Sequence, residues 1–461
     1  MGYYLRSSVK STEVKPLSPS SLFDFLALVR SGIAAASSTQ GEDEESPPAP
    51  DLDEGEPPPS KRTRISSSSD FTPKDAGSSA SAASGSQRSI RNKANAKRAR
   101  KRRENATKGP STRTLSQVLS HGVAVEVDID AASLDSAKGA HTGKPGTAAK
   151  LGSQAEIRRE YQVQELLDRG FQRLRWDGVT PTPIIDSSGR IFSVLAGRPG
   201  IEYVRDLEEV SELFTKAGQD AGLQATAHSG PHKRGAFPAF NRGVTMGMGS
   251  PTPVALQTGY MTPILDHLVG HAAVRRMAAY QEAAFSLWAP RLYAEYQRTS
   301  NVMHTKLPHL PKNFPHSVFA AAAFNLGGKV RTFKHRDSLN WPFGWCAITS
   351  LGTFDPSRSG QLILWELQLV IDFPHASTVL IPSAVITHSN TPLAEEDIRM
   401  SFTQYTAGPI FRWVENGCRT EKELEVADPA RYVEMQARKD TAYLRRLANF
   451  STVDELLDRI E

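Results

Sequence analysis

The amino-acid sequence predicts an α+β protein with a β-sandwich or jelly-roll core, helices that support this core, and a disordered arm before both. Three observations predict this class. The chain contains 6 Trp, 11 Tyr and 19 Phe, but only five of these aromatic residues lie among residues 1–150. Between 317 and 413, apolar runs separated by Gly and Pro have the length of six short strands. Much of the remaining sequence after residue 150 shows the apolar spacing of helices.

The composition of the 461 residues excludes disulfide-rich and membrane-spanning proteins. Two cysteines, Cys346 and Cys418, are too few for a disulfide scaffold or a cysteine-ligated zinc cluster, so we expect a reducing compartment. The sequence has no run of about 18 apolar residues, so we expect no membrane span. A net charge of +5 permits nucleic-acid binding but does not establish it.

Residues 1–150 are predicted to form a disordered arm, because a stretch with so few aromatic residues buries too little apolar surface to offset its ordering entropy. Residues 41–56 contain eight acidic residues, and the basic run at 88–108 contains ten Lys or Arg residues and one acid, Glu104. A dense basic run is typical of a nuclear import signal or of a tether to a phosphate backbone. A merely solvated charge block is the alternative. We predict a nuclear protein.

Residues 151–315 are predicted to form a mixed helical and β support region. Its expected elements are a helix over 156–174, two strands around a turn within 182–197, a helix over 206–217, a Gly- and Pro-rich loop over 226–257, and a long helical region over 264–300 with a break near Pro290.

Residues 316–417 are predicted to form the β core, and residues 418–461 the C-terminal helices. Within the core, Leu367, Leu369, Ile371 and Phe373 alternate with other residues, which is the period of a strand with one buried face. The last helix is expected to begin at the capping box formed by Ser451 and Asp454.

A candidate metal site lies in the predicted core. On a strand, His335 and Asp337 share one face, because residues two apart point the same way. His388 follows after room for about four short strands, directly behind a well-formed apolar strand. Two imidazoles and one carboxylate are typical of a facial triad for non-heme Fe(II), which leaves three coordination positions open.

The strand after His388 carries polar residues on one face. Arg399, Ser401, Thr403 and Tyr405 are spaced two apart, so their side chains point the same way. A guanidinium on this face is suited to bind a dicarboxylic co-substrate bidentately. The alternative is that the face is simply exposed to solvent.

Four segments resemble the TET/JBP-type 2-oxoglutarate and Fe(II)-dependent dioxygenases, and more narrowly the fungal, transposon-associated members. The segments are HRDSLNWPFG, GTFDPSRSGQLILWELQLVIDFP, IPSAVITHSN and IRMSFTQYTAGPIFRW. The resemblance is clear over 317–417 and implies a double-stranded β-helix. Two departures are that two cysteines cannot supply the zinc region of animal members, and that Ala407 stands where some relatives have histidine.

The resemblance also implies roles for individual residues. His335, Asp337 and His388 would bind iron, and Arg399 and Ser401 would hold the C5 carboxylate of 2-oxoglutarate. Two further residues would bind the substrate, with contact to the target base from Asn340 and stacking on it from Tyr405.

The activity implied by this resemblance is oxidation of the methyl group of 5-methylcytosine in DNA, with Fe(II), 2-oxoglutarate and dioxygen. A base inside a duplex is out of reach, so the nucleotide would be flipped into the pocket. DNA is therefore the expected partner. One alternative keeps the cofactors and changes the substrate to RNA, another modified base or a protein side chain. The other is a catalytically inactive, transposon-derived nucleic-acid-binding protein.

Overall fold

The structure is a computed structural model, which describes residues 14–17, 110–144, 152–225, 234–247, 249–439 and 441–460. These residues form a ten-stranded and a four-stranded β-sheet. The larger sheet contains, in spatial order, β1 (Val14–Pro16), β2 (Val123–Glu126), β4 (Thr182–Ile185), β5 (Ile191–Gly197), β12 (Thr378–Ile381), β9 (Cys346–Thr353), β14 (Ile398–Tyr405), β8 (Ala321–Asn325), β6 (Ala239–Thr245) and β7 (Val254–Ala255). The smaller sheet contains β13 (His388–Asn390), β10 (Leu362–Leu364), β11 (Leu369–Ile371) and β3 (Gln172–Leu174).

From β8 onward the chain passes back and forth between the two sheets. β8 and β9 belong to the larger sheet, β10 and β11 to the smaller, β12 to the larger and β13 to the smaller, and β14 returns between β9 and β8. Paired strands among these seven run antiparallel. One apolar cluster joins the sheets, with Leu364 from the smaller and Leu380 from the larger. The predicted α+β class is confirmed, and the antiparallel sheets are consistent with the predicted jelly-roll core, with seven strands where six were expected.

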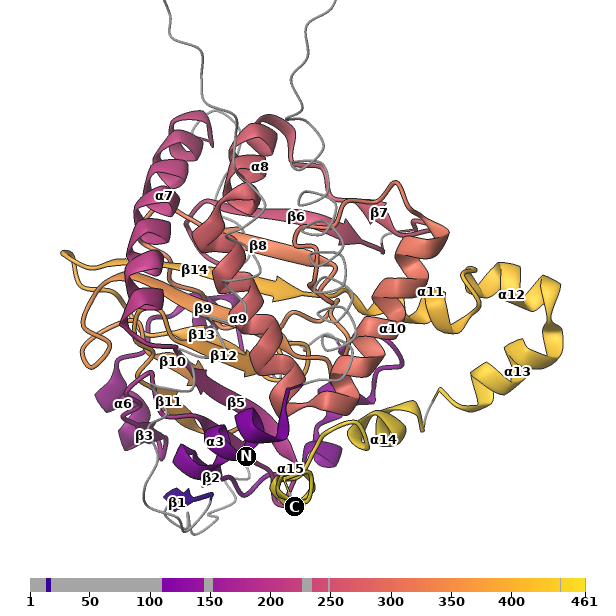
Figure 1. Ribbon diagram of the computed structural model, residues 1–461, viewed down its shortest axis with the longest axis horizontal. Helices are drawn as coiled ribbons and strands as arrows, with labels where there is room; N and C mark the ends of the chain where they lie inside the picture. The colour runs from indigo at the N-terminus through magenta and orange to yellow at the C-terminus, as the bar shows by residue number, and fades with distance from the viewer. Residues whose placement is uncertain are drawn as a thin grey trace, which may run out of the picture. The chain divides into compact units, whose positions relative to one another are not determined.

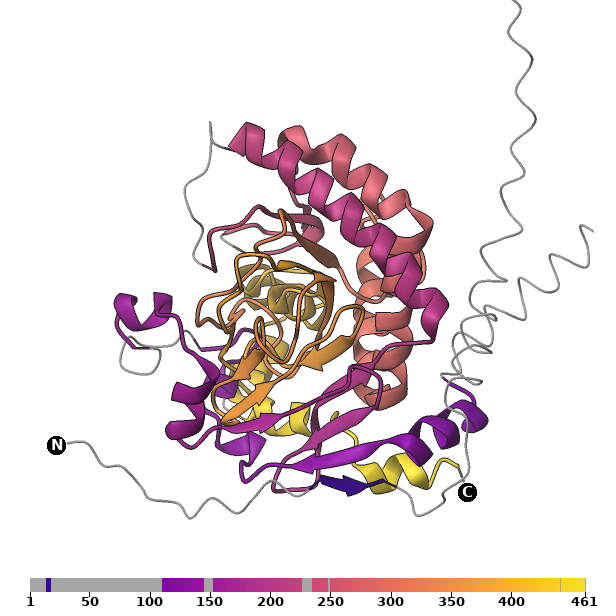
Figure 2. The ribbon, with the colours of Figure 1, turned by 90° about the vertical axis from the view of Figure 1, so that its left-hand side faces the viewer.

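Long helices cover one face of the larger sheet (Figures 1 and 2). They are α7 (Ile201–Ala225), α8 (Thr262–Gly270), α9 (Ala272–Trp288) and α10 (Pro290–Lys306). Phe214 of α7 packs against Phe324 and Phe402 of the sheet, with ring centroids 5.7 and 6.5 Å apart. The predicted break at Pro290 is present, because this proline starts α10. A second break at His271 separates α8 from α9.

The central strand β14 separates the helical layer from the interior between the sheets. Met400 and Phe402 are fully buried in the apolar cluster that includes α7 and α9. Arg399 and Ser401 lie on the opposite face and are only 2% and 5% exposed. The alternative that this polar face is open to solvent is therefore wrong.

Part of the predicted arm is folded. The prediction of disorder over 1–150 is wrong for residues 110–144, which contain α3 (Thr112–His121), β2 and the short 3₁₀ turns η1 (Ala131–Ser133) and η2 (Asp135–Lys138). Leu115, Leu119 and Val125 are buried in the main apolar cluster. Aliphatic side chains bury this segment, so a count of aromatic residues misses it. The charge blocks at 41–56 and 88–108 lie outside the described residues.

The support region also differs in detail from the prediction. The expected helix over 156–174 is divided into α5 (Gln154–Arg158), α6 (Val163–Asp168) and β3, and the expected loop over 226–257 contains β6 and β7. A 3₁₀ turn, η3 (Gly259–Met261), precedes α8. No helix among the described residues is long and apolar enough to cross a membrane.

Five helices follow the last strand. They are α11 (Gly408–Glu415), α12 (Glu421–Ala427), α13 (Pro429–Ala437), α14 (Ala442–Leu447) and α15 (Val453–Leu457). The predicted capping box is one residue out of register, because Thr452 and Glu455 form it in place of Ser451 and Asp454. In Figure 1, α12 and α13 extend away from the sheets and α14 returns toward them.

Glu282 of α9 is a buried acid that makes stability depend on pH. It accepts hydrogen bonds from the backbone N–H of Val318 at 3.1 and 3.2 Å and from the hydroxyl of Tyr293 at 2.7 Å. Burial raises the pKa of Glu282 to about 7, although these hydrogen bonds oppose the shift. Between its ordinary value and about 7, the folded chain binds more protons at this site than the unfolded chain. Raising the pH through this window therefore lowers the free energy of unfolding.

We expect Glu282→Gln to remove this dependence. The Glu282 contribution falls by about 3 kcal/mol between about pH 4.5 and pH 7, on the scale of 1.4 kcal/mol per pKa unit. Urea unfolding at several pH values in this window measures the difference between the wild type and the variant. The exposed Glu208→Gln on α7 is the matched control, with the pH dependence of the wild type. Equal slopes for Glu282→Gln and the wild type would contradict the prediction.

Candidate metal centre

Two histidines and one aspartate come together at the edge of the smaller sheet. His388 is the first residue of the edge strand β13, and His335 pairs with it as an isolated antiparallel bridge. The N–H of each residue donates to the C=O of the other, at 3.0 and 2.9 Å. The imidazole centroids lie 4.2 Å apart. The Nε2 atom of each imidazole lies 3.9 Å from a carboxylate oxygen of Asp337.

Hydrogen bonds to the backbone fix the tautomer of both imidazoles. The Nδ1 of His335 lies 2.7 Å from the C=O of Phe333, and the Nδ1 of His388 lies 3.0 Å from the C=O of Ile386. A carbonyl oxygen only accepts, so each Nδ1 donates and each Nε2 presents its lone pair toward Asp337. Burial, assisted by the neighbouring His388, lowers the pKa of His335 to about 3, so this ring is neutral at neutral pH.

Asp337 is held as a carboxylate. Its backbone N–H donates to the C=O of Ser383 at 3.0 Å. Burial disfavours the charge, but the two imidazoles and Arg234 hold the pKa of Asp337 below its ordinary value. Nη1 of Arg234 lies 3.8 Å from Oδ1 of Asp337.

These three side chains fit a divalent metal ion. One ligand atom from each of His335, Asp337 and His388 lies within 4.8 Å of the others, and the described part of the chain holds no other such group. Two neutral imidazoles and one carboxylate suit non-heme Fe(II) and leave coordination positions for other ligands. The structure therefore brings together the residues that the sequence nominated.

Arg399 is a buried cation that lacks an anionic partner. Its Nη1 donates to the C=O of Val330 at 3.0 Å, and its Nε has no hydrogen-bond partner in the described structure. Burial alone lowers the pKa of Arg399 to about 10, and no carboxylate opposes this shift. An unpaired buried charge is costly, so this guanidinium fits an anionic ligand that completes its contacts.

Ser401 lies beside Arg399 in a row of polar side chains across three strands. On β8 and β9, Asn325 and Ser350 lie opposite Ser401. Nδ2 of Asn325 donates to Oγ of Ser401 at 3.0 Å, so the serine proton is left for another acceptor. Oδ1 of Asn325 and Oγ of Ser350 have no partners among the described residues. Together with Arg399, this row fits one carboxylate of a dicarboxylate such as 2-oxoglutarate.

Gly360 leaves room for the Arg399 side chain. Its φ is +67°, and a Cβ built on it would lie 2.8 Å from Cδ of Arg399. We expect Gly360→Ala to lower the free energy of unfolding by about 1–2 kcal/mol, because an L-residue is strained in this conformation, and to weaken 2-oxoglutarate binding. Urea unfolding and calorimetric titration measure the two effects.

Gly189→Ala is the matched control for this substitution. Its φ is +79°, but no atom lies within 4 Å of the added Cβ. It carries the backbone strain without the contact to Arg399, so stability should fall while 2-oxoglutarate affinity stays unchanged. Equal affinity in both variants would show that Gly360 leaves no needed space.

Asn340, predicted to contact the substrate, lies beside Asp337. Its N–H donates to the C=O of Asp337 at 2.8 Å. Its Nδ2 donates to Sγ of Cys346 at 3.2 Å and to Oγ of Ser383 at 3.3 Å. The amide group is thereby oriented by the protein.

Tyr405, the other predicted substrate residue, lies near the same carboxylate. Its hydroxyl lies 3.0 Å from Oδ1 of Asn241 and donates to it. Burial raises the pKa of Tyr405 above its ordinary value, and the charges of Arg234 and Asp337 also act on it. The hydrogen bond to β6 holds the end of the ring in place.

Sequence reasoning missed Arg234, Asn325 and Ser350. Asn325 ends the apolar run FAAAFN, and a polar residue at the end of a buried strand is a usable signal. Arg234 offers none, because it lies in the Gly- and Pro-rich segment predicted as a loop.

No protein-family model matches the chain, and no curated protein matches it. Among solved structures it is similar to NgTET1 in complex with 5mC DNA, at 13% identity over 53% of this chain and 89% of that chain, with a TM-score of 0.34. It is also similar to a 2OG-Fe(II) oxygenase family oxidoreductase from Burkholderia pseudomallei, at 15% identity over 44% and 88% of the chains, with a TM-score of 0.23. A third is AviO1 from Streptomyces viridochromogenes Tue57, at 13% identity over 47% and 89%, with a TM-score of 0.22. These likenesses are distant, and the function is argued below from the side chains of the centre.

Proposed function

We propose that the protein is an Fe(II)- and 2-oxoglutarate-dependent dioxygenase. The observation that carries this proposal is the His335, Asp337 and His388 cluster, whose two Nε2 lone pairs face one carboxylate. The buried and unpaired Arg399 supports the co-substrate. A closed structural metal site would need a fourth protein ligand, and the described residues offer none at this place.

The residues of the centre have separate roles in this proposal. His335, His388 and Asp337 hold the ion, and Arg399 with Ser401 binds the far carboxylate of 2-oxoglutarate. When bound, these cofactors and dioxygen supply an oxidation that inserts one oxygen atom into a C–H bond of the substrate as 2-oxoglutarate becomes succinate and carbon dioxide. The buried walls of the centre exclude water and orient the reactants.

The proposed substrate is the methyl group of 5-methylcytosine in DNA. The support is the motif resemblance, together with Asn340 and Tyr405, which both lie beside Asp337. A flipped base would reach these two side chains. The basic run at 88–108 supports sequence-independent contact with DNA and a nuclear location.

Incubation of the full chain with Fe(II), 2-oxoglutarate and 5-methylcytosine duplexes tests both levels of the proposal. Mass spectrometry of the nucleosides should find oxidised cytosine, and succinate should form in step with it. Succinate formation without oxidised cytosine would refute the DNA substrate and retain the cofactors. A panel of RNA, other modified bases and peptides would then identify the substrate from its effect on succinate release. Absence of succinate with every candidate would favour the inactive nucleic-acid-binding alternative.

A further inference from the structure

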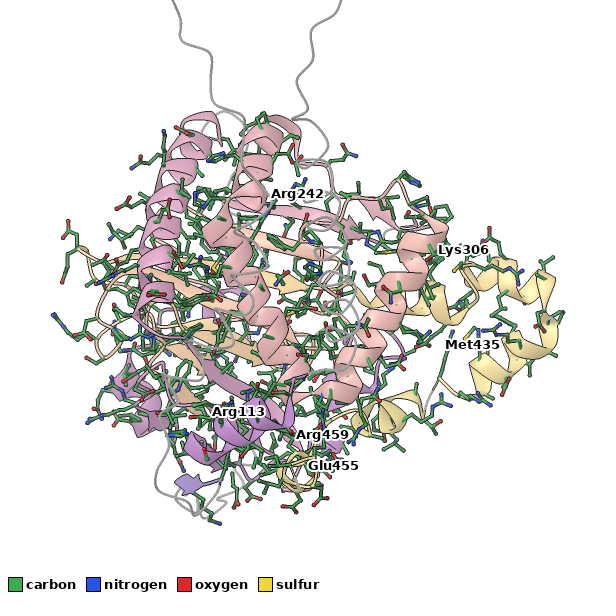
Figure 3. The ribbon with its side chains drawn as sticks, in the orientation of Figure 1. Arg113, Arg242, Lys306, Met435, Glu455 and Arg459 are labelled. Atoms are coloured by element: carbon green, nitrogen blue, oxygen red, sulfur yellow. The ribbon has the colours of Figure 1, made fainter. Side chains whose placement is uncertain are left out.

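A cavity of about 360 Å³ lies between the C-terminal helices and the rest of the fold, apart from the metal centre. Its lining comes from α10, α11, α13, α14, the segment at 140–141 and Trp341. In Figure 3, Met435 marks the part of its wall that belongs to α13. This volume is at the lower end of the range for small-molecule sites, which is about 300–1,000 Å³.

Basic side chains predominate in this lining. The basic residues are Arg431, Arg438, Lys439, Arg445 and Arg446, and the acidic ones are Glu295, Glu415 and Glu434. Each of these acids already has a partner. Glu434 pairs with Arg438, Glu415 accepts from Nε2 of His141 at 2.7 Å, and Glu295 pairs with Arg298 at 2.8 Å.

Three arginines remain without a carboxylate partner. Lys439 pairs with Glu421 at 3.0 Å, outside the lining. Arg431 donates to a backbone carbonyl, the C=O of Glu415, at 2.6 Å. Within the part of the chain that the structure describes, no carboxylate lies within ion-pairing distance of Arg431, Arg445 or Arg446.

Arg446 is the buried member of this trio. It is 6% exposed, its guanidinium lies 5.6 Å from the ring centroid of Trp341, and Nη1 has a long hydrogen bond of 3.5 Å to the C=O of Gly139. Burial lowers the pKa of Arg446 to about 10; the charge of Glu415 opposes this shift and the adjacent Arg445 adds to it. A buried cation with a like charge beside it favours a bound anion.

We propose that this cavity binds a phosphate group between Arg446, Arg445 and Arg431. Guanidinium groups bind phosphate oxygens bidentately, and three unpaired ones suit a dianion with three terminal oxygens better than a carboxylate with two. The cavity exceeds the size of phosphate itself, so the ligand is a phosphorylated compound or the phosphorylated end of a nucleic acid. The site holds whether or not the metal centre is active.

The cavity and the metal centre share a loop. Trp341 directly follows Asn340, and Asn340 pairs with Ala407 immediately before α11. Trp341 also stacks on Phe411 of α11, with centroids 4.1 Å apart, and Arg446 lies over the same indole. Binding at Arg446 therefore changes the surroundings of this tryptophan, and its fluorescence provides a second readout.

Calorimetric titration of the full chain with inorganic phosphate tests the site directly. We expect saturable binding with a change in tryptophan fluorescence, and a loss of at least about tenfold in affinity in Arg446→Gln. Because Arg446 is buried, Arg445→Gln and Arg431→Gln, both at exposed positions, provide variants that leave the core intact and should weaken binding severalfold. The exposed Arg459→Gln, labelled in Figure 3 near the C-terminus, is the matched control and should bind like the wild type.

Two further titrations distinguish the sources of phosphate. A deoxynucleoside monophosphate that competes with inorganic phosphate supports a small ligand. A 5′-phosphorylated oligonucleotide that binds more tightly than its unphosphorylated form, by a margin that Arg445→Gln removes, supports a nucleic-acid end. The proposal is overturned if the wild type shows no saturable binding by about 10 mM phosphate. It is also overturned if folded Arg445→Gln and Arg431→Gln bind phosphate as tightly as Arg459→Gln.

Discussion

Asp337→Ala is expected to abolish succinate formation and to lower metal affinity. The substitution removes the anionic ligand of the centre, and Arg234 at 3.8 Å then faces the two imidazoles without a carboxylate between them. A metal ion contributes several kcal/mol of charge stabilisation in such reactions, so we expect turnover to fall by at least about a thousandfold. Succinate release and metal content after dialysis measure the two effects.

The control for this variant is an aspartate outside the centre. Asp168 is exposed at the end of α6 and accepts a hydrogen bond from Gln164 at 2.9 Å. Asp168→Ala should retain full turnover and metal content. If folded Asp337→Ala still formed succinate at the wild-type rate, His335 and His388 would not belong to a working metal centre, and the proposed enzyme class would be wrong.

Arg399→Gln is expected to weaken 2-oxoglutarate binding without destabilising the fold. Breaking a buried charge contact with a ligand costs about 3 kcal/mol, which corresponds to about a hundredfold in affinity. In the free protein Arg399 has no carboxylate partner, so its removal relieves a desolvation cost. We therefore expect the free energy of unfolding to stay constant or rise.

Calorimetry with a redox-inert metal in the centre measures this affinity independently of turnover. Arg113→Gln is the matched control, because Arg113 is exposed on α3 and labelled in Figure 3 away from the core. It should leave both 2-oxoglutarate affinity and stability unchanged. Equal affinities in Arg399→Gln and Arg113→Gln would remove Arg399 from the co-substrate site and leave the metal site unaffected.

The sequence was most informative where one strand has two chemically different faces. Along β14, Arg399 and Ser401 alternate with Met400 and Phe402, and a period of two predicts which side chains share a face. Pro290 likewise predicted a helix boundary, because its ring cannot continue the preceding helix. These signals are local, so a single sequence contains them.

Other features depend on contacts between distant segments. Leu115 and Val125 lie in a stretch without aromatic residues, and they are buried only because β2 pairs with β4. Arg234 reaches Asp337 across about 100 positions from a segment with no periodic pattern. The short strands β6 and β7 form because β6 pairs with β8, which composition alone does not indicate.

The backbone hydrogen bonds between His335 and His388 also bear on which metal the centre takes up. The ligands are already oriented before an ion arrives, so binding demands little rearrangement of the chain. A rigid site of two imidazoles and one carboxylate follows the general affinity order of divalent ions, in which nickel and copper exceed iron. Occupancy by iron would then reflect the supply of metals at the time of folding, and competing ions would act as inhibitors that chelation followed by added Fe(II) reverses.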